Sequence, residues 1–194
     1  MIRFARLAAL SAVALGLTGC LLPEKFEASV NFKPDGAYTY KYEGTAVHFL
    51  AAATLKEKGG LPAKDEDGLK QEAEKAAKAP GVRKMTYTGN GRFDVQIDED
   101  VKAGRQVSTL KIFSITRDKD GVFMLAVPPM KENDRDQLRS FGIKVNGKAE
   151  VFLPGNAKVL EHNATGTPGL LSKSYSWKIG AVDDRPMIRF TLAQ

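Results

Sequence analysis

Cysteine and histidine are almost absent from this sequence. Its 194 residues include one cysteine, Cys20, and two histidines, His48 and His162. A single thiol excludes an intramolecular disulfide and any cysteine-rich zinc or iron–sulfur site. The histidines lie far apart in the chain, and neither belongs to a His-x-x-x-His pair. The pattern therefore predicts no metal site and no cofactor site.

Long apolar runs and blocks of like charge are also missing. The longest uncharged apolar run, residues 7–17, is too short to cross a bilayer, because a spanning helix needs about 20 residues. The charged run at residues 131–136 mixes both signs, which is unlike a nucleic-acid-binding arm. A hydrophobic content of 43%, with 10 Phe and 5 Tyr, is enough for a packed core and excludes global disorder. No nucleic-acid partner is expected.

The N-terminus has the pattern of an export signal. Arg3 and Arg6 precede the apolar run, and this order is typical of a secretory signal peptide. The run ends in a leucine, two small residues and the cysteine, which are Leu17, Thr18, Gly19 and Cys20. These four residues resemble the lipobox of bacterial lipoproteins in their order, their position and the run before them.

The lipobox resemblance has a chemical consequence at Cys20. It implies that signal peptidase II removes residues 1–19 and that the Cys20 sulfur receives a diacylglycerol thioether. It also implies an acyl chain on the new amino group, and two or more chains anchor a protein stably in a membrane. The next residue is Leu21 rather than Asp, which in a Gram-negative host resembles sorting to the periplasmic face of the outer membrane. We therefore expect a lipid-anchored protein of the cell envelope.

Removal of the signal shortens the chain to 175 residues. Two arginines leave with it, so the formal net charge falls from +6 to +4. Residues 20–25 are expected to form a short lipidated tether that keeps the domain close to the bilayer. Residues 26–194 are expected to form a single domain, and the alternative is a smaller C-terminal β subdomain that starts near residue 143.

Hydrophobic periodicity predicts an α+β fold. Period-two alternation indicates strands at 26–32 and 38–42, and two consecutive helices are expected at 45–58 and 64–79. The expected order then continues with an antiparallel meander at 82–88, 92–98, 106–117 and 122–127, a short helix at 132–141, and strands at 148–153, 157–161, 172–179 and 187–192. The prediction is one or more curved antiparallel sheets of about 8–10 strands. We expect the concave face, if lined by Phe, Tyr and Leu, to hold an acyl chain.

Several short motifs resemble catalytic or metal-binding patterns without fulfilling them. Ser108 and Lys111 have the Ser-x-x-Lys spacing, but a strand would point them to opposite faces. The acidic turns at 65–68 and 118–121 lack ligands that a calcium loop requires. The sequence therefore indicates no catalytic residue, and the chain is not expected to be an enzyme. A carboxylate-based hydrolase remains a minor alternative, because 23 acidic residues always allow a pair.

Aromatic residues on expected strands have two interpretations. Tyr38, Tyr40 and Tyr42 could form a stacking surface, but a core stripe with hydroxyls at the rim is favoured. Trp177 is likewise expected in the core rather than in a ligand platform. Asn163 begins a glycosylation sequon, which should be unused in a bacterial lipoprotein.

The mature chain also resembles the LppM-type bacterial lipoproteins. The similarity lies in residues 30–36, in the first expected hairpin, and in residues 177–179 near the end. It implies a sheet-and-helix domain related to lipid-binding helix-grip folds. The order of elements differs, because a helix-grip fold ends in its long helix, so no binding residue is transferred.

These observations lead to a functional hypothesis from the sequence alone. The chain is expected to be a non-catalytic lipoprotein whose partners are the membrane, through Cys20, and a lipid or other apolar envelope ligand. The alternative is a structural or assembly accessory that docks on an envelope protein complex.

Overall fold

The computed structural model describes residues 21–170 and 172–193. Within these ranges the elements, in chain order, are β1 (Leu21–Phe32), β2 (Tyr38–His48), α1 (Phe49–Lys58), α2 (Ala63–Ala76), β3 (Val82–Gly89), β4 (Arg92–Val101), β5 (Ser114–Arg117), β6 (Phe123–Ala126), α3 (Glu132–Ser140), β7 (Asn146–Phe152), β8 (Ala157–His162), β9 (Ser174–Ile179) and β10 (Met187–Leu192). The predicted α+β class is confirmed, with two consecutive helices early in the chain and a short third helix.

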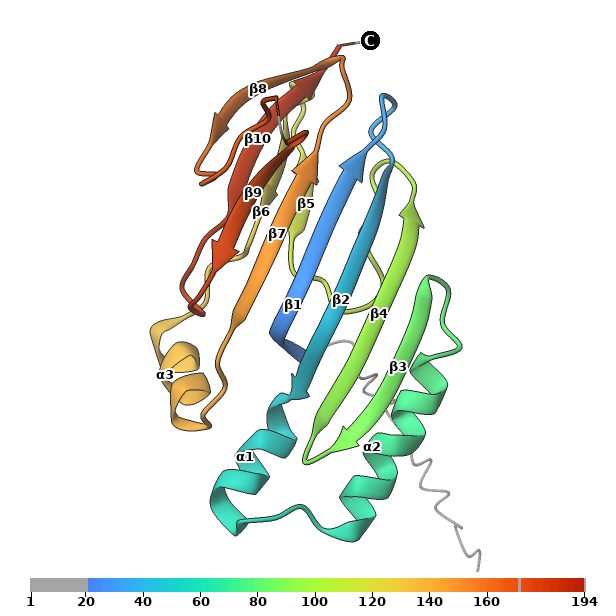
Figure 1. Cartoon of the computed structure of the whole chain (residues 1–194), viewed down its shortest axis with the longest axis vertical. Helices are drawn as coiled ribbons and strands as arrows, with labels where there is room; N and C mark the ends of the chain where they lie inside the picture. The colour runs from blue at the N-terminus through green and yellow to red at the C-terminus, as the bar shows by residue number, and fades with distance from the viewer. Residues whose placement is uncertain (1–20, 171, 194) are drawn as a thin grey trace, which may run out of the picture.

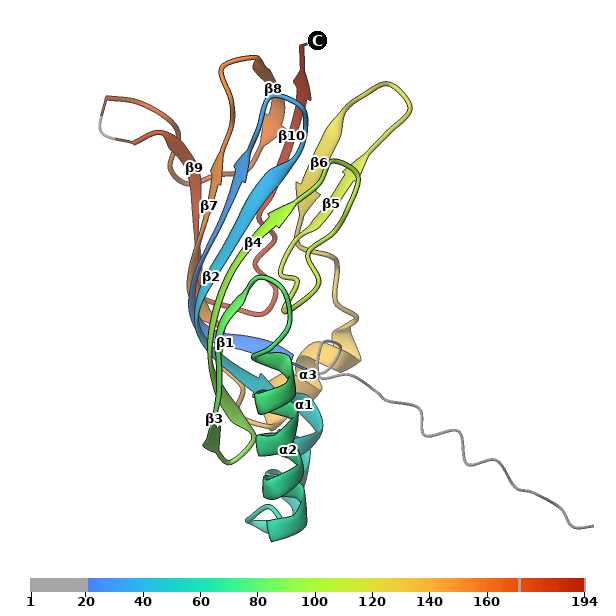
Figure 2. The same ribbon diagram turned by 90° about the vertical axis from the view of Figure 1, so that its right-hand side faces the viewer.

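The strands form two facing sheets. One has six strands in the order β3-β4-β2-β1-β7-β9, and the other has four in the order β5-β6-β10-β8. The larger sheet curves around the smaller one, and the three helices gather at one end of the molecule (Figures 1 and 2). None of the helices in the described ranges is long and apolar enough to cross a bilayer.

The core lies between the two sheets. Alternating residues of β1 point inward, and Phe26, Val30 and Phe32 are each less than 9% exposed. The Phe32 ring lies 4.8 Å from the Phe190 ring and 5.9 Å from the Phe123 ring, measured between centroids. These aromatic contacts join the central strand of the six-stranded sheet to the four-stranded sheet.

The prediction that residues 20–25 form a tether is wrong for residues 21–25, which the structure describes as part of a strand. β1 begins at Leu21, which pairs with His48 of β2. Leu21 is only 8% exposed, because its apolar side chain packs into the core. The sheet therefore begins one residue after Cys20, without a spacer.

The first helix starts later than predicted. Residues 45–48 continue β2 and pair with β1 on one side and β4 on the other. Val47, which the periodicity placed on a helix, is a fully buried strand residue. Pairing on both edges outweighs the weak helical pattern of this segment, so α1 begins at Phe49.

The predicted four-strand meander is divided between the two sheets. β3 and β4 belong to the six-stranded sheet, whereas β5 and β6 belong to the other. The strand expected at 106–117 is limited to Ser114–Arg117. Residues 102–113, called here the crossing segment, link the sheets instead. Leu110 in this segment has φ +47°, which is incompatible with a continuous strand.

One strand pair is parallel, although only antiparallel pairs were expected. β7 lies beside β1 in parallel, so that Ala28 is opposite Ala149. After β7 the chain alternates between sheets, because β8 and β10 belong to the smaller sheet and β9 to the larger. Residues from about 143 onward therefore complete both sheets and do not form a separate C-terminal subdomain.

Candidate functional site

An apolar pocket opens where the first residues of β1 meet α3 and the crossing segment. Its volume is about 330 Å³. The lining comes from six separate parts of the chain: Leu21, Leu22, Pro23, Phe26, Leu110, Lys111, Ile112, Val127, Pro128, Pro129, Met130, Asp134, Leu138, Ile143, Val145, Ile179, Ala181, Val182 and Asp184. We refer to it as the N-terminal pocket, because the first three described residues belong to its wall.

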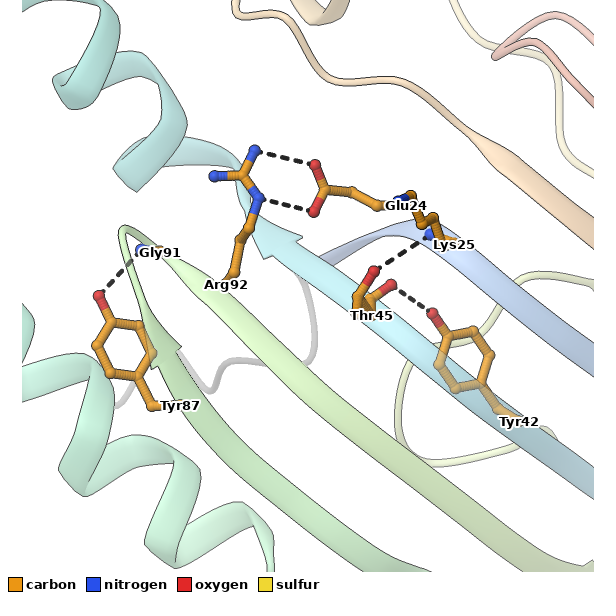
Figure 3. Close-up of polar contacts among 7 residues, drawn as sticks. All are labelled: Glu24, Lys25, Tyr42, Thr45, Tyr87, Gly91 and Arg92. Carbon is orange, nitrogen blue, oxygen red and sulfur yellow. Dashed lines mark hydrogen bonds and ion pairs between the residues drawn. The ribbon is translucent and has the colours of Figure 1, made fainter.

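A bend in β1 forms the first wall. The pairing of β1 with β2 shifts register between Pro23 and Phe26, which turns the start of the strand away from the rest of the sheet. Gly44 lies opposite this bend, where a β-carbon would be 2.1 Å from the Lys25 carbonyl oxygen. The Lys25 amide donates to Thr45 Oγ1 at 3.3 Å (Figure 3). Only glycine permits so close an approach of the two backbones.

An ion pair fixes the same bend. Arg92 of β4 donates from Nε and Nη2 to the two carboxylate oxygens of Glu24, at 2.9 and 3.1 Å (Figure 3). The Glu24 side chain is 13% exposed, so this bidentate contact is more shielded than a usual surface ion pair. The residues that follow Cys20 are thereby held to β4 across the intervening β2.

The crossing segment forms the second wall. Tyr40 donates its hydroxyl to the Leu110 carbonyl at 2.9 Å, and Tyr38 donates to the Arg105 carbonyl at 3.0 Å. These bonds satisfy backbone groups of a segment that lies outside both sheets. Burial raises the pKa of Tyr40 above its ordinary value and that of Tyr38 to about 12. Both phenols therefore remain protonated donors.

The third wall combines α3 with the turn after β9. Leu138 of α3 packs with Ile143, Val47 and Ala52 in a small apolar cluster. In the turn, Asp184 accepts hydrogen bonds from the Gly180 and Ala181 amides at 2.6 and 3.0 Å. The Asp184 carboxylate therefore holds the turn in place.

The lining of the N-terminal pocket is largely apolar. Apolar side chains form its interior, and the charged residues in its wall are Lys111, Asp134 and Asp184. Lys111 and Asp134 are exposed, whereas Leu110 and Leu138 are each 3% exposed. A largely apolar cavity with a few polar groups is the usual form of a small-molecule site.

Two other depressions on the described surface are more open to solvent. One of about 910 Å³ lies over β7 and β9, and its lining includes Lys148, Ser176 and Lys178. Another, of about 340 Å³, lies on the outer face of the six-stranded sheet among Glu27, Lys41 and other charged residues. The larger of the two has apolar lining from Phe26, Trp177 and Ile179 but is open to solvent, whereas the N-terminal pocket is more enclosed.

The four lipobox residues and the two histidines are placed as follows. Leu17, Thr18, Gly19 and Cys20 lie outside the described residues. His48 ends β2, and its Nδ1 accepts a hydrogen bond from the Ala51 amide at the start of α1. Burial lowers the pKa of His48, which keeps this acceptor neutral. His162 ends β8 in the other sheet and contacts Tyr175, so the structure gives the two histidines separate roles.

The acidic residues at 65–68 lie in the first turns of α2, and the turn at 118–121 and Ser108 have local structural roles. Asp118 Oδ1 accepts from the Asp120 and Val122 amides, which is ordinary turn geometry. Ser108 Oγ donates to Glu99 at 3.1 Å. Among the residues described, no three His, Cys, Asp or Glu side chains gather as metal ligands would.

The core interpretation of the aromatic strand residues is confirmed. Tyr38, Tyr40 and Tyr42 are each 1% exposed, and Trp177 is 4% exposed. Trp177 Nε1 donates to Asn163 Oδ1 at 2.8 Å. The Asn163 amide nitrogen donates to the Arg185 carbonyl, so the sequon asparagine is committed to a structural contact.

The pocket is not where the sequence placed it. The concave face of the large sheet was expected to hold a ligand, but its aromatic side chains fill the core against the smaller sheet. The pocket instead lies at one end of the sandwich, and its wall includes the dipeptide Pro128-Pro129 after β6. Among the expected elements, these prolines only follow the strand that ends at residue 127. No local signal joins them to Leu21, because the contact depends on the tertiary fold.

Comparison with known proteins adds one structural similarity. No family model matches the chain, and no curated protein matches it. A solved structure with a similar arrangement is the NMR structure of the folded domain of the Mycobacterium tuberculosis LppM protein. The identity is 13%, the match covers 88% of this chain and 91% of that chain, and the TM-score is 0.36. At these values the similarity says nothing about a ligand.

Proposed function

We propose that this chain is a lipid-anchored, non-catalytic protein of the bacterial envelope whose domain binds an acyl chain in the N-terminal pocket. The anchor is supported by the lipobox that ends at Cys20 and by the apolar run before it. The observation that carries the ligand is the pocket itself, which has an apolar interior of about 330 Å³. Leu21, the residue after Cys20, belongs to its wall.

The energetics favour exchange with a membrane rather than tight capture. Burial of an acyl chain from water gains about 0.8 kcal/mol per methylene. A chain that already lies in a bilayer has made that gain, and its transfer into the pocket is therefore close to neutral. A pocket held beside the membrane would load and unload lipid reversibly.

Replacement of Cys20 by alanine tests the anchor. We expect the variant to lose incorporation of a palmitate analogue in cells and to leave the membrane fraction, because no other cysteine can carry the lipid. The measurement is in-gel detection of the labelled acyl group after cell fractionation. The matched control is Ser11→Ala, a similarly small change within the apolar run before the lipobox. Acylation of the Cys20→Ala variant at the wild-type level would refute the anchor.

Replacement of Val182 by tryptophan tests the pocket. Val182 is a half-buried residue of the pocket wall, so an indole there occupies space for about two methylenes. At about 0.8 kcal/mol per methylene, affinity should fall roughly tenfold. The measurement is the Kd of a fluorescent hexadecanoate analogue for residues 21–194, expressed without the signal and Cys20.

Leu160→Trp is the control for this experiment. Leu160 lies on β8 outside the pocket and is 48% exposed. It adds the same indole to the surface and should leave the Kd unchanged. Equal probe binding by wild type and Val182→Trp, with both folded by circular dichroism, would refute the pocket. A stoichiometric crosslinked protein partner with no bound lipid would instead support the assembly role.

A further inference from the structure

We propose that the end of the molecule containing the start of α1 lies against the bilayer, with Leu50 at the boundary between headgroups and acyl chains. This inference rests on the proposed lipidation of Cys20. It adds an orientation, a contact residue and a kind of partner, a lipid surface, to the proposed function.

No spacer separates Cys20, the proposed site of the anchor, from the first strand of the fold. One residue of extended chain spans at most about 3.6 Å. Cys20 directly precedes Leu21, which already pairs with His48 in the sheet. The surface around Leu21 is therefore held within about one residue length of the lipid-bearing residue, and this end of the molecule faces the membrane.

The same end of the molecule exposes an apolar side chain, Leu50. Phe49 begins α1 immediately after His48, and the next residue, Leu50, is 58% exposed. Few large apolar residues in the described ranges are so exposed. Leu50 is therefore an apolar side chain near the anchor that the fold leaves uncovered, as expected of a residue that contacts lipid.

Leu50 lies in a part of α1 that is held in place by its neighbours. The Phe49 ring contacts the Phe141 ring, at 5.4 Å between centroids, and joins α1 to the residue after α3. The His48 side chain caps the helix. A fixed apolar side chain can insert into a lipid surface without losing the conformational freedom of a loop.

The figures agree with this orientation. The start of β1 lies near α1 and α3 at one end of the sandwich, and the β1–β2 and β5–β6 turns lie at the other (Figure 2). The N-terminal pocket shares Leu21 with the membrane-facing end. Lipid could then enter the pocket from the bilayer without crossing water.

Site-directed spin labelling tests the orientation. The lipidated full-length mature protein has no thiol other than Cys20, so an introduced cysteine takes the only label. The two variants are Leu50→Cys and, as control, Lys119→Cys in the exposed β5–β6 turn. Both are reconstituted in vesicles of phosphatidylethanolamine and phosphatidylglycerol. The measurement is collision of the nitroxide with oxygen and with a water-soluble nickel chelate.

The expected result is opposite behaviour of the two labels. The oxygen-to-nickel collision ratio at position 50 should exceed that at 119 by roughly tenfold, since an interfacial residue lies about 5–10 Å into the headgroup region. Equal ratios in vesicle-bound protein would overturn the orientation alone. Protection of position 50 from both reagents would indicate a protein contact and would also overturn it. Failure of both variants to float with vesicles would refute the anchor and this inference together.

Discussion

Replacement of Gly44 by alanine is expected to lower the free energy of unfolding by about 3 kcal/mol. The new β-carbon would lie 2.1 Å from the Lys25 carbonyl oxygen and 2.6 Å from the Phe26 Cα. Both are backbone atoms, so no side-chain rotation relieves the contact. The backbone φ of +155° at Gly44 adds strain for an L-residue. The bend in β1 must then open, which also removes the first wall of the N-terminal pocket.

Gly89→Ala is the matched control for this change. Gly89 also lies in the six-stranded sheet with a positive φ, +93°, but no atom lies within 4 Å of the position its β-carbon would take. Its cost should be about 1 kcal/mol, from backbone conformation alone. Urea unfolding of both variants measures the difference. Equal destabilisation would show that the close approach at the bend does not limit stability.

Replacement of Phe190 by alanine is expected to cost about 4 kcal/mol, typical of a buried phenylalanine. Phe190 is fully buried on β10, and its ring stacks on Phe123 at 5.2 Å with an interplanar angle of 8°. It also meets Phe32 edge to face at 4.8 Å. Its loss leaves a cavity between the two sheets at the point where they are joined.

Met124→Ala is the control for the aromatic contact. Met124 lies on β6 next to Phe123 in sequence but is 41% exposed, so its truncation should cost about 0.5 kcal/mol. Both variants are compared by chemical denaturation, with the acyl probe binding of each measured in parallel. A Phe190→Ala variant as stable as Met124→Ala would mean that the sheets are held together by other contacts.

Alternation of apolar and polar residues was enough to predict the first two strands and the hairpin strands that follow the helices. The alternation at 26–32 and 38–42 predicts β1 and β2 because one face of each strand is buried. The strands expected at 82–88 and 92–98 are joined by a tight turn at Asn90-Gly91, with φ of +53° and +72° at these two residues. Such positive values are what Asn and Gly allow in a tight turn.

The features that sequence reasoning missed depend on distant parts of the chain. The parallel pairing of β7 with β1 joins residues more than 100 positions apart, and both strands have the same alternation as antiparallel ones. Residues 45–48 belong to β2 rather than to a helix because this end of β2 lies between β1 and β4 and pairs with both. The N-terminal pocket assembles from six segments, so no single window of the sequence contains its pattern.

The positions of β1 and β10 within their sheets have a consequence for the order of folding. β1 follows Cys20 directly, yet it lies between β2 and β7 and lacks one neighbour until residue 152 is available. β10 lies between β6 and β8, so the smaller sheet closes only with the last strand. Contacts of such long sequence separation form slowly. Neither sheet can therefore be completed before the C-terminal residues have been synthesised.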